Sequence, residues 1–312
     1  MITIKDLLNK LKDICGNKHI TLTKGIDFNY DETSKTLHMI IKNGIKTNMQ
    51  KDVSAFEGWA LIFKANLGEY IDIVTLNWNK YDEPTDKSKE EWRHFNRFLY
   101  RVDKFEKLYS DWFKAETQNN SWEKQVKNEG WSSLVLNKEG DRKLSEEEEK
   151  FSLDNEHEIE EYFKKNDKLK IELKKYGIEI DEVKNQFPIG IFNGKVEKSN
   201  YIFTGGKSAI DLYGMDEKNK SFNIFELKGY NNIKIGILSE LFFYSSIIRD
   251  AIDGNIEFGE HKNIENYKLN AFFLVQVLHP LITENVIKLL NVSNKRIEYH
   301  VLKYAIEDIK FD

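Results

Sequence analysis

Residues 208–228 read SAIDLYGMDEKNKSFNIFELK, and a polar stretch in this segment separates two apolar ones. Period-two alternation in the second apolar stretch places Glu226 and Lys228 on one face of a strand. The first apolar stretch predicts another strand, which carries Asp211, and the polar residues between them suit a hairpin loop. The hairpin would bring Asp211 beside Glu226.

The segments around this hairpin alternate between helical and strand-like patterns. A helix is predicted at residues 155–166, and a second strong helical pattern follows the hairpin. The full predicted order is helix 155–166, strands 187–192, 208–213 and 221–227, helix 233–252, strand 270–278, helix 282–290 and strand 296–304. Three antiparallel strands followed by helix, strand, helix and strand predict an α/β fold with a mixed central sheet flanked by helices.

The first part of the chain predicts a separate α+β domain. A hairpin is predicted at residues 20–41 and a helix around 55–65. Strand-like alternation covers 70–78, and a helical pattern runs from 87 to about 115. A polar, acidic stretch with four consecutive glutamates then marks a change of composition, and we place the domain boundary near residue 145. Residues 1–145 would recognise substrate or a partner, and residues 146–312 would form the second domain.

A basic face accompanies the aromatic residues of the 87–115 helix. Arg93, Arg97, Arg101 and Lys104 lie close together on it, and cations beside aromatic rings can bind a nucleic-acid backbone. The preferred interpretation is structural. The aromatic residues follow helical spacing and predict core, while the arginines have acidic neighbours and predict a solvated face.

The composition is that of a folded chain without a general affinity for nucleic acid. Hydrophobic residues make up 40% of the sequence and charged residues 32%, which is too apolar for disorder. The net charge of -5 gives no basic footprint over the whole chain, so nucleic-acid binding would need a local basic groove.

Other patterns exclude several classes of protein. No apolar run approaches the length of a membrane span, and residues 1–14 predict an amphipathic helix and not a signal peptide, so we expect no membrane association. Cys15 is the only cysteine, which excludes an internal disulfide and fits a reducing cytoplasm. The seven histidines never fall at i, i+4 spacing, so no zinc site is expected.

The predicted hairpin carries residues suited to metal-dependent chemistry. Two carboxylates as close as Asp211 and Glu226 repel each other unless a cation lies between them, and Mg²⁺ or Mn²⁺ would fill that place. A bound metal lowers the pKa of its water and neutralises charge on a phosphate, while Lys228 could orient the attacking water or stabilise the transition state. These residue types match phosphodiester hydrolysis.

In this segment the sequence resembles the PD-(D/E)xK nuclease superfamily, over roughly residues 155–305. Asp211, Glu226 and Lys228 stand where that family has its motif, with Ile210 in place of the usual proline. The resemblance implies a restriction-endonuclease-like fold and an Mg²⁺-dependent endonuclease that acts on DNA in preference to RNA, in a defence, restriction or repair system. The alternative is a noncatalytic nuclease-like module that binds nucleic acid or a protein partner.

The resemblance adds two further candidates. Such families often carry a glutamate on the first helix, with apolar residues three and seven positions later, and Glu156, Ile159 and Phe163 match this spacing. Glu156 also fits a plain helix N-terminus, capped by Asn155. The helix after the lysine strand sometimes carries a Gln-Leu-x-x-Tyr-like element, which residues 240–244 resemble with Glu240 in place of glutamine. An ordinary exposed helix position is the alternative for Glu240.

Two observations could argue against a nuclease motif at Asp211, Glu226 and Lys228. Asp211, Glu226 and Lys228 could form only a surface ion-pair cluster, but three charges on one face of neighbouring central strands would be costly without a ligand. The tripeptide Glu-Leu-Lys also occurs at residues 172–174, where we interpret it as a solvated element. The apolar helix at 235–252 could pack in the core or form a homodimer, and the first domain could bind a protein partner.

Overall fold

The computed structural model describes residues 2–81, 83–116, 120–137, 155–203, 208–230, 233–258, 264–292, 296–305 and 310–311. Within these ranges the chain is mixed α/β, with mixed sheets flanked by helices, and the predicted fold class is confirmed. None of the helices in the described ranges has the length and apolar character to cross a membrane.

The chain divides into two compact units that are not continuous in sequence. Unit 1 consists of Met1–Ser132, Lys234–Glu240 and His279–Lys295, and unit 2 consists of Ser133–Ile233, Leu241–Leu278 and Arg296–Asp312. The boundary expected near residue 145 lies outside the described residues. Two short segments from the second half of the chain therefore pack with the first half.

Unit 1 contains a sheet in the strand order β1-β2-β3-β4. Its strands are β1 (Ile26–Asp31), β2 (Thr36–Ile41), β3 (Ile73–Trp78) and β4 (Phe113–Ala115). Its helices are α1 (Ile4–Cys15), α2 (Phe56–Asn66), α3 (Glu90–Leu108), α4 (Trp122–Glu129), α8 (Glu284–Val292) and the 3-10 helix η1 (Gly44–Lys46). The antiparallel β1–β2 pair confirms the predicted hairpin, and β3 and β4 add parallel strands beside it.

The late segments join unit 1 through close contacts with α2. Thr283, just before α8, donates a hydrogen bond of 2.6 Å from its hydroxyl to Asn66 Oδ1 at the end of α2. A Cβ at Gly58 of α2 would lie 2.6 Å from a side-chain carbon of Ile235, so only glycine permits this approach. These contacts explain why the segments at 234–240 and 279–295 belong with the first half of the chain.

Two of the four basic residues predicted on the solvated face of α3 are buried, which corrects the interpretation of these two. Arg97 and Arg101 are 2% and 1% exposed. Arg101 donates a 2.7 Å hydrogen bond from Nε to Glu57 Oε1 and a 2.8 Å bond to the carbonyl of Ser54, and Glu57 is itself fully buried. Glu57 also accepts a 2.8 Å bond from Ser239 Oγ. The charge of Arg101 is therefore neutralised inside the protein and is not offered to a phosphate backbone.

Unit 2 is built on a sheet in the strand order β13-β12-β11-β10-β9-β6, with a small second sheet in the order β5-β7-β8. The strands of the larger sheet are β6 (Lys184–Pro188), β9 (Ala209–Asp216), β10 (Ser221–Lys228), β11 (Lys268–Val275), β12 (Ile297–Ala305) and β13 (Lys310–Phe311). Those of the small sheet are β5 (Leu134–Leu136), β7 (Ile191–Asn193) and β8 (Tyr201–Phe203). The helices are α5 (Glu156–Lys165), α6 (Lys168–Leu173), α7 (Gly236–Ile252, shared with unit 1), η2 (Lys174–Tyr176) and η3 (Lys198–Asn200).

The strand directions in unit 2 confirm the predicted mixed sheet. β6, β9 and β10 pair antiparallel, and β11 and β12 then follow parallel to β10. The single strand predicted at 187–192 is divided in the structure: β6 ends at Pro188 in the large sheet, and β7 begins at Ile191 in the small one. Proline has no N–H to continue a ladder, which suits the point where the chain leaves the large sheet.

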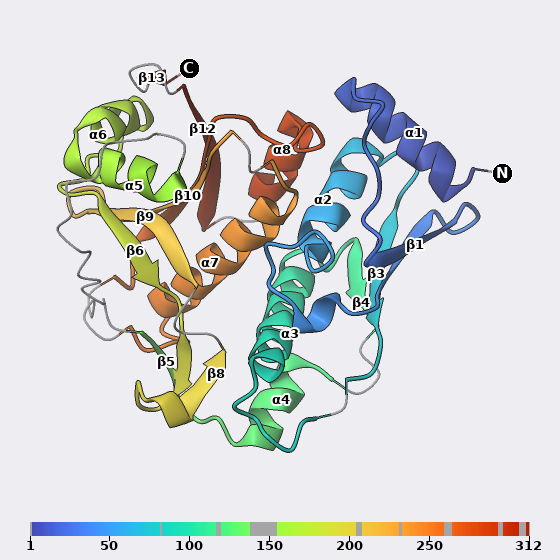
Figure 1. Cartoon of the computed structure of the whole chain (residues 1–312), viewed down its shortest axis with the longest axis horizontal. Helices are drawn as coiled ribbons and strands as arrows, with labels where there is room; N and C mark the ends of the chain where they lie inside the picture. The colour runs from blue at the N-terminus through green and yellow to red at the C-terminus, as the bar shows by residue number, and fades with distance from the viewer. Residues whose placement is uncertain are drawn as a thin grey trace. The chain divides into compact units, whose positions relative to one another are not determined.

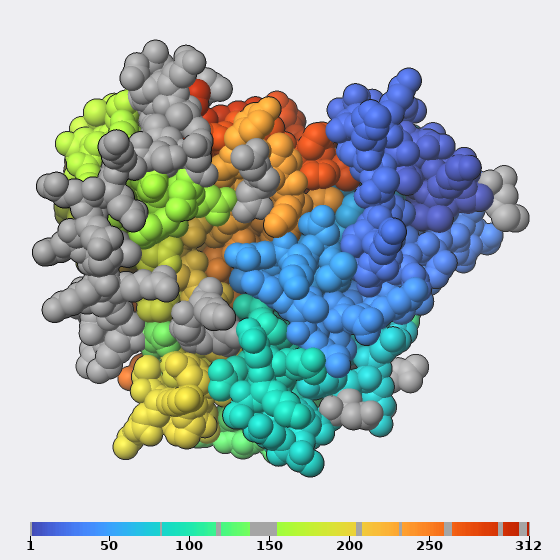
Figure 2. Space-filling view, in the orientation of Figure 1, coloured from blue at the N-terminus to red at the C-terminus, as the bar shows by residue number. Residues whose placement is uncertain are grey.

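Helices cover both faces of the large sheet in unit 2 (Figure 1). The side facing α5 and α6 has an apolar core, formed by residues such as Phe163, Leu212, Phe225 and Leu227, all below 1% exposed. On the other side, Ser245 of α7 makes a 2.7 Å hydrogen bond with the Tyr299 hydroxyl of β12. In the space-filling view, α5 and α6 lie at the outer surface of the unit (Figure 2). β10, buried along its whole length, lies between these layers.

We predict that Arg101→Ala destabilises the protein by about 3–5 kcal/mol, because it leaves the carboxylate of Glu57 buried without its guanidinium partner. Thermal and denaturant unfolding would measure the loss. Lys104→Ala on the half-exposed side of the same helix is the control, with an expected change within about 0.5 kcal/mol. An Arg101→Ala protein of unchanged stability with weakened nucleic-acid binding would instead favour a phosphate-binding role.

Candidate functional site

The β9–β10 hairpin forms as the sequence predicts, and its turn is fixed by Asp216. The Asp216 carboxylate accepts hydrogen bonds of 2.8 Å from Asn219 N in the turn and 2.7 Å from Glu179 N. The last pair of the ladder joins Phe225 to Leu212. Continuing this register by one residue places Asp211 opposite Glu226, as the alternation of the sequence predicts.

Asp211 closes the far end of the hairpin through its side chain. Its Oδ2 accepts a 2.7 Å hydrogen bond from the backbone N–H of Leu227, so the carboxylate lies directly over β10. The side chain of Asp211 is 17% exposed, whereas that of Glu226 is 1% exposed. One of the two carboxylates therefore faces the solvent side of the site, and the other lies inside.

The ammonium group of Lys228 lies between the two carboxylates. Lys228 Nζ donates a hydrogen bond to Glu226 Oε1 and is 3.9 Å from Asp211 Oδ2. The Lys228 side chain is only 10% exposed, so this is an ion cluster in a mostly dry environment and not a solvated surface pair. Burying charged groups costs free energy unless they are paired. Here the ammonium of Lys228 is the positive charge beside the carboxylates of Asp211 and Glu226.

Glu156 of α5 also reaches the end of β10. α5 begins after Asn155, whose side chain accepts a hydrogen bond from His157 N, as the predicted cap requires. Glu156 Oε1 accepts a 3.2 Å hydrogen bond from the backbone N–H of Gly229. The structure therefore places the Glu156 carboxylate against the backbone directly after Lys228, a contact beyond the charge of a helix N-terminus.

Glu160 is a site residue that the sequence interpretation missed. It lies one helical turn after Glu156, is 4% exposed, and accepts a 2.7 Å hydrogen bond from Gln186 Nε2. Burial, and next the negative charge of Asp211, raise the pKa of the Glu160 carboxyl to about 8, whereas Lys228 acts in the opposite direction. The i, i+4 spacing from Glu156 was the signal that could have found it.

Tyr304 of β12 completes the surroundings of the β10 end. Its hydroxyl donates a 3.3 Å hydrogen bond to the carbonyl of Lys228, and burial raises its pKa well above the usual range, with Glu156 acting in the same direction. Leu227 N, Lys228 O and Gly229 N are thus each held by a side chain of the site.

Glu240 makes a side-chain contact within unit 1. This residue lies in the part of α7 that belongs to unit 1, whereas the four other predicted site residues belong to unit 2. Its side chain is 1% exposed, so the alternative of an ordinary exposed helix position is wrong. Within unit 1 it accepts a hydrogen bond from Gln50 Nε2.

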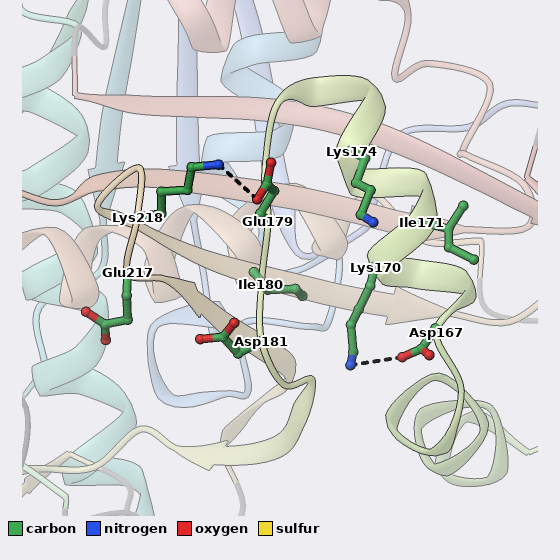
Figure 3. A pocket seen from close by; sticks show the side chains of 9 residues that line it. All are labelled: Asp167, Lys170, Ile171, Lys174, Glu179, Ile180, Asp181, Glu217 and Lys218. Carbon is green, nitrogen blue, oxygen red and sulfur yellow. Dashed lines mark hydrogen bonds and ion pairs between the residues drawn. The ribbon is translucent and has the colours of Figure 1, made fainter.

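The duplicate tripeptide spans the end of helix α6 and the start of η2, beside an open pocket of about 570 Å³ (Figure 3). Lys174 is exposed and lines this pocket, as a solvated element should. Glu172 departs from that expectation, because it is 7% exposed and forms a 2.8 Å ion pair with Lys175. The charges around the pocket partly neutralise each other through Lys170–Asp167 at 2.9 Å and Lys218–Glu179 at 3.2 Å. None of the predicted site residues lines it.

The donor set at the hairpin end fits a magnesium-like ion. Within the described ranges, no three His, Cys, Asp or Glu side chains are gathered so that they could hold a metal by themselves. Mg²⁺ needs only one or two carboxylates, because it keeps several of its waters, and Asp211 and Glu226 supply two. The ammonium of Lys228 between them shows that this position favours positive charge. The chemistry of the residues present is therefore compatible with a divalent ion.

Comparison of the chain with models of protein families, with curated proteins and with solved structures gave no match.

We predict that the pKa of Glu160 makes folding stability fall as pH rises. A carboxyl whose pKa is raised by folding contributes fully below its ordinary value near 4.5, and this contribution is lost as pH passes through about 8. Glu160→Gln should therefore melt a few degrees above the wild type at pH 8, since 1 kcal/mol corresponds to roughly 2–4 °C in a domain of this size. At pH 5 the two melting temperatures should be close.

These melts need a chelator, because a divalent ion nearby would lower the pKa of the Glu160 carboxyl. Glu161→Gln, a neighbouring glutamate of α5, is the control that should leave the pH profile in place. A difference between Glu160→Gln and wild type that is the same at pH 5 and pH 8 would contradict the raised pKa.

Proposed function

We propose that this chain is a divalent-metal-dependent nuclease that hydrolyses phosphodiester bonds, with DNA as the favoured substrate. The observation that carries the proposal is the arrangement at the end of β10, where the carboxylates of Asp211 and Glu226 flank the ammonium of Lys228. All three are at most 17% exposed. Two acids and a lysine buried together are energetically unfavourable for the fold alone, and such clusters are typical of functional sites. Metal-assisted phosphate chemistry would account for this one.

Each of these side chains has a distinct task in such a reaction. Asp211 and Glu226 would hold Mg²⁺ or Mn²⁺, which lowers the pKa of a bound water and neutralises charge on a phosphate oxygen. Lys228 brings a positive charge on a mostly buried side chain, where it stabilises the negative charge that develops on the phosphate more strongly than it would in water. Glu156 holds Gly229, and so fixes the backbone that follows the lysine.

The topology supports the same proposal. Two helices, three antiparallel strands, a helix, a parallel strand, a helix and a last parallel strand follow one another from α5 to β12, apart from the short elements η2 and η3 and the strands β7 and β8 inserted after β6. This is the order that the resemblance to the PD-(D/E)xK nucleases implies, and Asp211 and Glu226 occupy neighbouring strands of the antiparallel part. A fold by itself does not establish an activity, so the argument depends on the site.

The setting of the enzyme belongs to the same proposal. The single free cysteine, Cys15, fits a reducing cytoplasm, and a defence, restriction or repair role follows from the resemblance. Since Arg97 and Arg101 are buried, phosphate contacts would have to come from cations other than these two.

We expect Asp211→Asn and Glu226→Gln each to abolish divalent-dependent cleavage, with a loss of at least about 10³-fold, because each removes a metal-binding charge at nearly constant volume. Asparagine at 211 keeps an oxygen that can accept from Leu227 N, so the fold should persist. Cleavage of DNA and RNA would be followed in Mg²⁺ and in Mn²⁺, beside thermal melts.

Asp181→Asn is the matched control for Asp211→Asn, because Asp181 is an exposed aspartate of the same unit that lines the pocket in Figure 3. It should cleave like the wild type. Cleavage at wild-type rates by both Asp211→Asn and Glu226→Gln would show that the metal site is wrongly assigned. Metal and DNA binding by a wild-type protein that never cleaves would favour the noncatalytic module.

The two Glu-Leu-Lys segments give a second comparison. Lys228→Ala should lower the cleavage rate by at least roughly 10²-fold, the usual effect of removing one electrostatic stabiliser, whereas Lys174→Ala should remain within a few-fold of wild type. Lys174 is exposed at the start of η2, so its removal disturbs no buried pair. Similar losses for both lysines would mean that the buried ion cluster has no special part in the reaction.

A further inference from the structure

Gln186 has a backbone conformation that glutamine seldom adopts. It lies within β6 with a φ of 56°, in the left-handed region where a side chain is disfavoured and where glycine or asparagine is usual. Its neighbours pair regularly with β9, as Asn185 with Leu212 and Phe187 with Ile210. The backbone conformation of Gln186 therefore costs free energy, which the contacts of its side chain must offset.

The side chain of Gln186 reaches helix α5, as the side chain before it does. Asn185 Nδ2 donates a 2.7 Å hydrogen bond to Glu161 Oε1, and Gln186 Nε2 donates a 2.7 Å bond to Glu160 Oε2. Successive residues of a regular strand point to opposite faces, so they cannot both reach one helix. The left-handed φ of Gln186 breaks that alternation and delivers its amide to Glu160.

The contact lies at the candidate site. The pairs on either side of Gln186 place it opposite Asp211, and the hairpin register places Asp211 opposite Glu226. Glu160 is 4% exposed, and it interacts electrostatically with Asp211 and Lys228. Backbone strain of this kind collects where a side chain must be held in one position for function.

The geometry points to Gln186 as a positioning residue that holds Glu160 as an outer carboxylate of the metal site, where it accepts hydrogen bonds from water around the ion. This inference rests on the proposed function, in which Asp211 and Glu226 bind the metal. Mg²⁺ keeps several of its waters in proteins, so a carboxylate can act on the ion without touching it. Residues that orient such groups commonly change metal affinity about 10–100-fold.

Lys220 provides a matched control for the backbone effect. It is an exposed residue of the β9–β10 turn with a φ of 51°, so Lys220→Gly relieves the same conformation away from the site. Gln186→Gly and Lys220→Gly should both melt, in chelator, at the wild-type temperature or a few degrees above it, since glycine accepts a positive φ without a steric penalty. Gln186→Asn, which also tolerates this backbone, tests the length of the amide if Gln186→Gly fails to fold.

The decisive readout is the affinity for Mn²⁺, measured calorimetrically on the full chain without substrate, with Asp211→Asn as the reference that lacks the site. Gln186→Gly should bind Mn²⁺ about 10–100-fold more weakly than wild type, with a smaller loss for Gln186→Asn, whereas Lys220→Gly should bind like wild type. In a Glu160→Gln background, Gln186→Gly should cause little further loss, because Gln186 acts through Glu160.

An affinity of Gln186→Gly within about three-fold of wild type, with binding still abolished in Asp211→Asn, overturns the role of Gln186 and leaves the metal site standing. Equal losses in Gln186→Gly and Lys220→Gly also overturn it, because the effect would then belong to the backbone. Wild-type protein that shows no Asp211-dependent Mn²⁺ binding overturns the proposed function itself, and this inference with it.

Discussion

The hydrogen bond from Leu227 N to the carboxylate of Asp211 is the contact on which the rest of the site depends. The backbone pairing of β9 with β10 ends at Phe225 and Leu212, and the Asp211 side chain continues the contact beyond that pair. Asp211 is thereby held over β10 at the level of Glu226. Two acids at this spacing require positive charge, and Lys228, two residues further along the same strand face, supplies it. The site is therefore a consequence of one antiparallel register and one alternating strand.

The surrounding layers hold this strand end in place. The face of the sheet toward α5 and α6 is packed with large apolar side chains, while Glu156 at the start of α5 and Tyr304 of β12 each bond to the backbone beyond Leu227. Because the backbone is fixed from several elements, removing one charged side chain should alter chemistry more than fold. Hydrogen bonds from two further elements of the unit thus hold the backbone at this strand end.

Alternation and spacing were enough to predict the hairpin and the shared face of Glu226 and Lys228, because these depend on local periodicity. The interest in Glu156 came only from the resemblance to the nuclease family. Burial and backbone strain were not accessible in the same way. A helical pattern shows that Arg97 and Arg101 share a face, but not that Glu57 of another helix lies against Arg101. Gln186 gave no signal, because a positive φ in a strand follows from the contact with Glu160 and not from the residue type.

Crystals of the full chain soaked in millimolar Mn²⁺ would test the central claim most directly, by anomalous scattering at the manganese edge. The account predicts an anomalous peak between the carboxylates of Asp211 and Glu226, with the ammonium of Lys228 displaced from Glu226 by the arriving cation. A map without a peak at this position, in which Lys228 still bridges the two acids, would contradict it. The cluster would then be a buried ion pair that serves the fold alone.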